Sequence, residues 1–196
     1  MSAKPRSSKG ELRRRYKALR DGVPLEQRRI WSGQVAEHLS AFCAAAGISR
    51  VALFGPFGSE VDLGPFEFDN PQISFLFPRV VSLDPPRLAW GPRPLEPGLW
   101  GLLEPAVVPY VVPDVQLMLV PGLAFAADGH RLGYGKGFYD SALAALKGPV
   151  IPLGVAFELQ RCERLPTEPD DMPVQGLATE AGITWIEGAD WLFGLG

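Results

Sequence analysis

The segment from residue 117 to residue 140 constrains both fold and function more than any other part of the chain. It reads LMLVPGLAFAADGHRLGYGKGFYD: an apolar run ends at a Pro-Gly pair, an Asp-Gly turn follows, and glycines then alternate with Tyr134 and Lys136. A strand that ends in such a loop presents bare backbone N–H groups, which bind phosphate. The pattern alone leaves a phosphate-binding loop and a structural turn open, because turns are also rich in glycine.

Neither common phosphate-binding motif matches this segment. A Walker A loop needs a glycine where His130 stands and a Ser or Thr where Gly137 stands. The dinucleotide motif GxGxxG fails at Phe138. The loop nevertheless carries Arg131 and Lys136 as positive charges, and a carboxylate follows at Asp140, where it could hold a divalent cation.

Length and composition predict one folded domain. The chain has 196 residues, 46% of them hydrophobic, which suffices for a sizeable core. We expect residues 1–7 to be disordered and residues 8–196 to form the domain. No apolar run approaches the roughly 20 residues of a membrane span, and no secretory signal is evident. The two cysteines lack metal or disulfide spacing, so we expect a reducing, cytoplasmic location.

Periodicity and turn residues predict alternating helices and strands. The pattern is typical of an α/β fold, a three-layer domain with a mainly parallel sheet flanked by helices and a small antiparallel portion. In such sheets ligands bind beyond the carboxyl ends of the strands, where the glycine-rich loop lies. The expected helices cover residues 9–19, 24–46 and 137–146, and the expected strands cover residues 51–54, 73–77, 87–90, 115–120, 150–156 and 184–186.

Charge is distributed unevenly along the chain. Residues 1–30 contain ten basic and three acidic residues, a net +7, whereas the remainder contains nine basic and nineteen acidic residues, a net −10. A basic helix can bind nucleic acid, act as a targeting peptide or reach a polyphosphate, and it can also be a solvated face. The capping box at Ser8 and Glu11 favours an ordered helix over a targeting peptide. Because no basic stripe with interleaved aromatics continues beyond residue 30, nucleic-acid binding is disfavoured.

Taken together, the glycine-rich segment closely resembles the signature of the 5-formyltetrahydrofolate cyclo-ligase (5,10-methenyltetrahydrofolate synthetase) family. The resemblance runs from about residue 9 to residue 180. The chain departs from the family pattern at Leu63, Ala126 and Asp170. Outside the signature, the matching positions are Lys9, Leu12, Arg13, Glu60, Val61, Asp62, Trp100, Glu104, Pro105, residues 153–157, Gln160, Pro166 and Asp171.

This resemblance implies an activity and its cofactors. Members convert 5-formyltetrahydrofolate to 5,10-methenyltetrahydrofolate while ATP becomes ADP and phosphate, with ATP and Mg²⁺ required. The implied substrate is a small folate, with or without a polyglutamate tail, and we expect a monomer that binds neither nucleic acid nor membrane. Because Leu63 and Ala126 depart from the pattern, a folate-binding or regulatory homologue without turnover is the alternative.

The resemblance also implies roles for individual residues. Lys136, Arg131 and Tyr139 are the expected catalytic residues, and Asp140 and Asp171 the expected Mg²⁺ ligands. The residues expected at the ATP are Lys9, Arg13, Arg131, Leu132, Gly133, Tyr134, Gly135, Lys136, Gly137, Phe138 and Tyr139. Those expected at the folate are Gly55, Glu60, Trp100, Tyr134, Gly135, Lys136, Gly137 and Phe138.

Overall fold

The apolar run that precedes the glycine-rich loop forms the middle strand of a seven-stranded sheet. In the computed structural model, which describes residues 8–187, the strand order is β12-β11-β9-β6-β1-β2-β3. The five inner strands are parallel, and the outer strands β3 and β12 run antiparallel to their neighbours. The strands are β1 (Arg50–Ala52), β2 (Ser74–Leu83), β3 (Pro86–Gly91), β6 (Leu117–Pro121), β9 (Ile151–Val155), β11 (Gly176–Thr179) and β12 (Gly182–Trp185).

Alternating side chains of the inner strands build a core on each face of this sheet. Leu117 and Leu119 of β6 belong to one buried cluster, whereas Met118 and Val120 belong to the other. All four are fully buried. This double burial explains why the strand reads as a continuous apolar run rather than as alternating polar and apolar residues.

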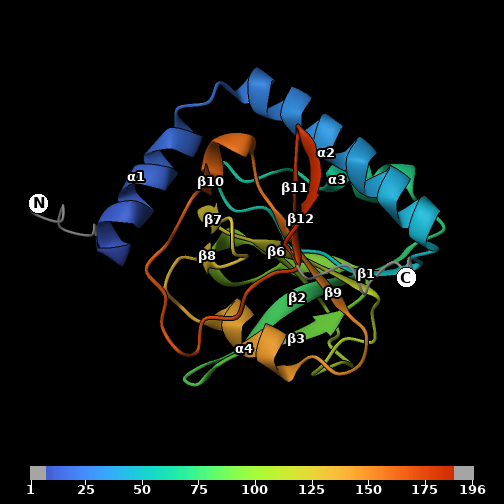
Figure 1. Ribbon diagram of the computed structural model, residues 1–196. Coiled ribbons are helices and arrows are strands. Elements are labelled where there is room, and N and C mark those ends of the chain that lie inside the picture. The colour runs from blue at the N-terminus through green and yellow to red at the C-terminus, as the bar shows by residue number, and fades with distance from the viewer. Residues whose placement is uncertain (1–7, 188–196) are drawn as a thin grey trace, which may run out of the picture.

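Helices cover both faces, which gives the three layers that the sequence predicts. Side chains of α2 (Leu25–Ala46) and α3 (Gly64–Asp69) pack into the first cluster, and Leu143 of α4 (Phe138–Ala145) packs into the second. Figure 1 shows α2 and α3 along one side of the sheet and α4 on the other. Gly47 ends α2 in the left-handed conformation, with φ of 64°, which glycine adopts without steric cost.

The first helix, α1 (Lys9–Asp21), lies against a small separate sheet. Ser8 and Glu11 form the predicted capping box, with hydrogen bonds of 3.2 and 2.8 Å. Tyr16 packs with Leu123 and Leu132. That sheet has the order β10-β7-β8 and consists of β7 (Ala124–Ala126), β8 (Arg131–Leu132) and β10 (Arg161–Cys162).

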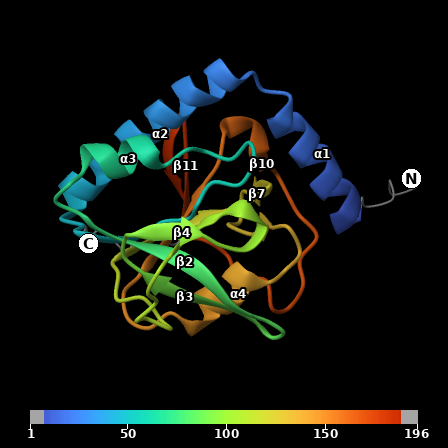
Figure 2. The same ribbon diagram turned by 180° about the vertical axis from the view of Figure 1, so that it is seen from behind.

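Several elements differ from the sequence prediction, among them the unpredicted strands β7, β8 and β10 of the small sheet. The short helix α3 was not predicted, because six residues are too few for a clear helical period. The strand β11 was not predicted either. The segment 91–113, predicted as an irregular connection, contains a hairpin of β4 (Leu95–Pro97) and β5 (Leu103–Pro105) around a 3₁₀ turn (Leu99–Gly101), visible in Figure 2. Prolines at its strand ends hid this hairpin.

Two other predictions concern residues that the structure does not describe. The predicted disorder of residues 1–7 and the end of the predicted domain at residue 196 lie outside the described residues.

Within residues 8–187, no helix combines the length and apolar character that a bilayer span requires. A second 3₁₀ turn, Glu158–Gln160, follows β9.

We expect Leu119→Ala to lower the free energy of unfolding by about 2–5 kcal/mol, because it removes a fully buried side chain from the central strand. Leu83→Ala is a matched control, since Leu83 is 61% exposed and its loss should cost less than about 0.5 kcal/mol. Denaturant titration measures both. Equal losses for the two variants would contradict the assigned core.

Candidate active site

A cavity of about 990 Å³ opens at the carboxyl ends of β1 and β6. It is bounded by the segment after β1, the glycine-rich loop, both ends of the β4–β5 hairpin turn, the start of α4 and residues 168–172. Every residue that the sequence predicts for the site lines it. The glycine-rich loop and the cavity thus lie beyond the carboxyl ends of the strands, where ligands bind in such sheets.

Helix α1 contacts the glycine-rich loop through Arg13. The Nε of Arg13 donates a hydrogen bond of 2.9 Å to the carbonyl of Gly133. Gly135 has φ of 84°, and a Cβ there would lie 3.0 Å from the Arg13 guanidinium carbon. Glycine is thus required for both conformation and space. Within residues 8–187, no backbone N–H of residues 133–137 donates to a protein acceptor, so these donors remain free for an anion.

The cavity contains two cations from this loop in contrasting environments. The Arg131 side chain is 5% exposed and its Nη2 contacts Asp140 Oδ1 at 2.8 Å. Its buried Nε has no hydrogen-bond partner among the described residues. Burial lowers the pKa of Arg131, and the nearby Asp140 carboxylate opposes that shift. Lys136 is exposed and has no ion pair within residues 8–187.

Both predicted metal ligands are paired with cations. Asp140 also accepts a 3.3 Å hydrogen bond from the Met172 N–H, which places it beside residues 168–172. Asp171 accepts from Lys9 Nζ at 2.7 Å and from the Glu168 N–H at 2.7 Å. Burial acts to raise the pKa of Asp171, but these hydrogen bonds hold it below its usual value. In the described part of the chain, no three acidic, His or Cys side chains form a metal cluster.

The two carboxylates Asp140 and Asp171 suit a hard divalent cation that takes oxygen ligands. Mg²⁺ is commonly held by one or two carboxylates together with waters and substrate phosphates. A site with just two carboxylates therefore fits Mg²⁺ accompanied by a phosphate ligand, and it does not fit a metal enclosed by protein side chains alone.

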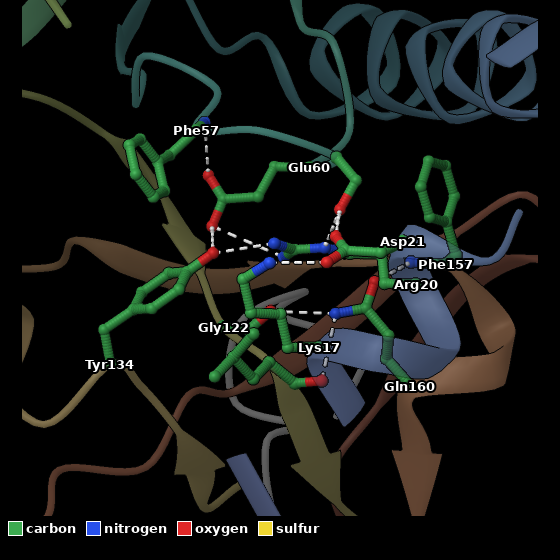
Figure 3. Close-up of polar contacts among 11 residues, drawn as sticks. Lys17, Arg20, Asp21, Phe57, Glu60, Gly122, Tyr134, Phe157 and Gln160 are labelled. Carbon is green, nitrogen blue, oxygen red and sulfur yellow. Dashed lines mark hydrogen bonds and ion pairs between the residues drawn. The ribbon is translucent and has the colours of Figure 1, made fainter. Parts of the chain in front are cut away.

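Glu60 forms the opposite end of the cavity and is almost fully buried, with 6% of its side chain exposed. Its Oε2 accepts from the Phe57 N–H at 2.9 Å, and its Oε1 accepts from the Tyr134 hydroxyl at 3.2 Å and lies 3.5 Å from Arg20 Nη1 (Figure 3). Burial raises the pKa of Glu60, opposed chiefly by Arg20. An ionised carboxylate has about four acceptor positions, so at least one remains for a ligand.

Aromatic side chains line the cavity between these two ends. Trp100 is 52% exposed and packs edge-on against Phe138, with ring centroids 6.1 Å apart. Its φ of 56° is unusual for a residue other than glycine and costs on the order of 1 kcal/mol. Burial raises the pKa of Tyr139, which therefore stays protonated. Gly55 also lines the cavity, and a Cβ added there would lie 3.6 Å from the Leu103 carbonyl oxygen.

A buried glutamine holds the Pro-Gly turn at the end of β6. Gln160 Nε2 donates to the carbonyls of Gly122 and Leu123 at 2.8 and 3.1 Å, and its Oε1 accepts from the Phe157 N–H at 2.9 Å (Figure 3). A Cβ on Gly122 would lie 2.8 Å from the ring of Phe125. The start of the loop is thereby fixed in space.

Sequence reasoning missed two contributions to the site. Arg20, to which the sequence analysis assigns no individual role, is buried and contacts Glu60. The apolar wall made by Val80, Pro86 and Leu88 comes from β2 and β3. The sequence does indicate this position for Arg20, because Arg20 lies seven residues after Arg13 and therefore on the same helix face. No comparable signal marked the wall.

Comparisons with known proteins agree with this geometry. The sequence model of the 5-formyltetrahydrofolate cyclo-ligase family matches residues 5–180. The solved structure of Aquifex aeolicus 5,10-methenyltetrahydrofolate synthetase is 35% identical, with a TM-score of 0.79 over 91% of this chain and 93% of that one. The Mycoplasma pneumoniae 5,10-methenyltetrahydrofolate synthetase is 23% identical, with a TM-score of 0.71 over 89% and 99% of the two chains, and shows the shared fold.

The match to curated relatives is shorter. The Haemophilus influenzae 5-formyltetrahydrofolate cyclo-ligase is 38% identical over 85 residues, which are 41% of this chain and 46% of that protein. The aligned stretch thus spans about half the length of that relative. The family match, in contrast, covers most of the chain and includes every residue of the cavity described above. This chain belongs to the 5-formyltetrahydrofolate cyclo-ligase family.

Proposed function

We propose that this protein converts 5-formyltetrahydrofolate to 5,10-methenyltetrahydrofolate at the expense of ATP. The observation that carries the proposal is a single cavity with free backbone donors and cations at one end and the buried Glu60 carboxylate at the other. The names of the relatives support the same activity.

The chemistry explains why both ends are needed. A formamide carbon is a poor electrophile, and its oxygen leaves poorly as hydroxide. Transfer of the ATP γ-phosphoryl group to the formyl oxygen makes the carbon electrophilic. N10 then bonds to that carbon, the carbon–oxygen bond breaks, and phosphate departs with the oxygen while N10 loses its proton. The protein must align the two substrates and stabilise charge on the phosphoryl group.

The glycine-rich loop would supply that stabilisation. Arg131 and Lys136 act on the transferring phosphoryl group, and the free N–H groups of residues 133–137 bind its oxygens. Each well-placed donor is worth on the order of 3 kcal/mol. Lys9 and Arg13 extend the positive surface from α1, and the remaining nucleotide contacts come from Leu132, Tyr134, Phe138 and Tyr139.

Mg²⁺ would be held by Asp140 and Asp171 and would neutralise charge on the nucleotide phosphates when bound. These carboxylates contact Arg131 and Lys9 in the structure. The chain's own cations therefore hold both side chains in place beside the loop.

At the other end, Glu60 would accept hydrogen bonds from the N–H donors of the reduced pterin. Tyr134 and Phe138 from the loop side would contact the substrate together with Gly55 and Trp100. Gly135, Lys136 and Gly137 would lie between folate and ATP. We retain the sequence-based proposals of a cytoplasmic monomer, a folate substrate with or without a polyglutamate tail, and no nucleic-acid or membrane partner.

Incubation of the purified protein with 5-formyltetrahydrofolate and MgATP tests this function. We expect the methenyl chromophore to appear with an equal amount of ADP. Binding of the folate without turnover would instead support the alternative, a regulatory homologue.

We expect Lys136→Met to lower kcat about 10²–10³-fold, since it removes an unpaired cation from the phosphate end of the cavity. Steady-state turnover measures the change. Lys147→Met replaces an exposed lysine just beyond α4 and should leave kcat unchanged. A Lys136→Met variant with near-normal turnover would remove this residue from the mechanism.

We expect Asp140→Asn to raise the Mg²⁺ concentration needed for half-maximal turnover about tenfold or more, because an amide binds Mg²⁺ more weakly than a carboxylate. Titration of MgCl₂ at saturating ATP measures it. Asp114→Asn, at a site 83% exposed, is the control. An unchanged requirement in Asp140→Asn would contradict direct coordination.

We expect Lys9→Met to raise the pKa of Asp171, because burial then acts without the opposing ammonium. In the native protein the lowered pKa stabilises the contact between α1 and residues 168–171 above the ordinary aspartate pKa, and this contribution disappears as the pH falls through the folded value. Carboxyl ¹³C NMR titration measures the shift. A pKa of Asp171 that is unchanged in Lys9→Met would assign the lowering to the Glu168 N–H or another group.

A further inference from the structure

One arginine of the basic first helix is placed unlike the others. The side chain of Arg20 is 1% exposed, whereas Arg14 and Arg15 on the same helix are exposed. Burial of a cation is costly unless it is paired and hydrogen-bonded. Arg20 is also absent from the cavity lining, so it lies behind the site rather than in it.

The guanidinium of Arg20 is bonded through all three nitrogens. Its Nε donates to Ser59 Oγ at 2.9 Å, its Nη2 donates to the Tyr134 hydroxyl at 2.7 Å, and its Nη1 lies 3.5 Å from Glu60 Oε1 (Figure 3). Ser59 in turn donates to Asp21 Oδ1. One side chain therefore fixes the segment that carries Glu60.

The same guanidinium links the two ends of the cavity. Tyr134, from the glycine-rich loop, accepts from Arg20 and donates to Glu60 Oε1 at 3.2 Å. Burial and the Glu60 carboxylate raise the pKa of Tyr134 to about 12, so its hydroxyl remains a donor. The proposed folate-binding carboxylate and the proposed phosphate-binding loop thus share one buried arginine.

Loss of this arginine would leave Glu60 poorly supported. Burial raises its pKa, and Arg20 is the strongest opposing influence, followed by the Phe57 N–H and the Tyr134 hydroxyl. The other titratable group that faces Glu60 is Tyr139 from α4, which is neutral, and Asp21 lies beyond Ser59. No second cation among the described residues is paired with Glu60.

We infer that Arg20 is a positioning residue for folate binding: it keeps the Glu60 carboxylate ionised and aimed into the cavity, and it holds Tyr134 against it, without touching the substrate. This inference rests on the proposed function. A purely structural Arg20 would only fasten α1 to residues 59–60, and its loss would weaken both substrates alike at every pH.

The test compares folate binding in three variants over about pH 5–8. Arg20→Gln removes the charge and keeps a polar side chain, Arg20→Lys keeps the charge and loses the three-way geometry, and Arg14→Gln is the matched control from the exposed face of α1. Calorimetry gives the Kd for 5-formyltetrahydrofolate and, separately, for MgATP. Infrared spectroscopy, with Glu60→Gln as the reference, follows protonation of Glu60 in the ligand-free protein.

We expect Arg20→Gln to raise the folate Kd about tenfold at neutral pH, with a larger loss at acidic pH and recovery as the pH rises. Arg20→Lys should lie between Arg20→Gln and the native protein. The Kd for MgATP should change less than the Kd for the folate, because Arg20 reaches the nucleotide only through Tyr134, and Arg14→Gln should match the native protein throughout. The infrared titration of Glu60 should move to higher pH in the same order.

A loss of folate affinity that is the same at every pH, or an unchanged Glu60 titration, would overturn the inference. If Arg20→Gln does not fold, Arg20→Lys carries the test, and native folate binding and Glu60 titration in that variant would contradict it. Failure of the native protein to bind 5-formyltetrahydrofolate would instead refute the proposed function, and the infrared titration would still report whether Arg20 supports Glu60.

Discussion

The parallel pairing of β1 with β6 is the constraint on which the rest of the site depends. Val51 and Ala52 lie beside Leu117 and Met118, so both strands end at the same edge of the sheet. The chain after β1 leads to Gly55 and Glu60, and the chain after β6 leads to the glycine-rich loop. Two segments far apart in sequence therefore meet across one cavity, as the proposed transfer from ATP to the folate requires.

Basic side chains of α1 then form ion pairs and hydrogen bonds with several parts of that cavity. Lys9 contacts Asp171, Arg13 contacts the Gly133 carbonyl, and Arg20 contacts Glu60 and Tyr134. The helix thus places a cation at each part of the site. These three basic side chains thus contribute to the cavity, while exposed residues such as Arg14 contribute only to the surface.

The layers of this fold were predictable because the residues that set the ends of the helices and strands lie close together in the sequence. The capping box at Ser8, the glycine after α2 and the apolar run of β6 each fix a boundary through nearby residues. The hairpin of β4 and β5 is held beside β2 by the Glu104 carboxylate, which accepts from the Val80 N–H, and local periodicity does not contain this contact between distant residues. For Arg20, the spacing from Arg13 indicates the helix face that it shares, but its burial and its contact with Glu60 are visible only in the structure.

The residues of the candidate site were predictable for a different reason. Resemblance to the family supplied Glu60 and Trp100, which lie far from the glycine-rich segment in sequence, and physical reasoning alone would have stopped at Arg131, Lys136 and Asp140. The structure adds how these groups are held: Gln160 fixes the turn before the loop, and Arg20 fixes the carboxylate opposite it.

In the proposed reaction, this cavity brings the formyl oxygen of the folate to the terminal phosphate of ATP. Turnover of 5-formyltetrahydrofolate labelled with ¹⁸O in the formyl group, followed by mass spectrometry of the released phosphate, tests it most directly. The account predicts one ¹⁸O atom in each phosphate. Unlabelled phosphate with the methenyl product formed would show that the formyl oxygen leaves by another route and would contradict the account.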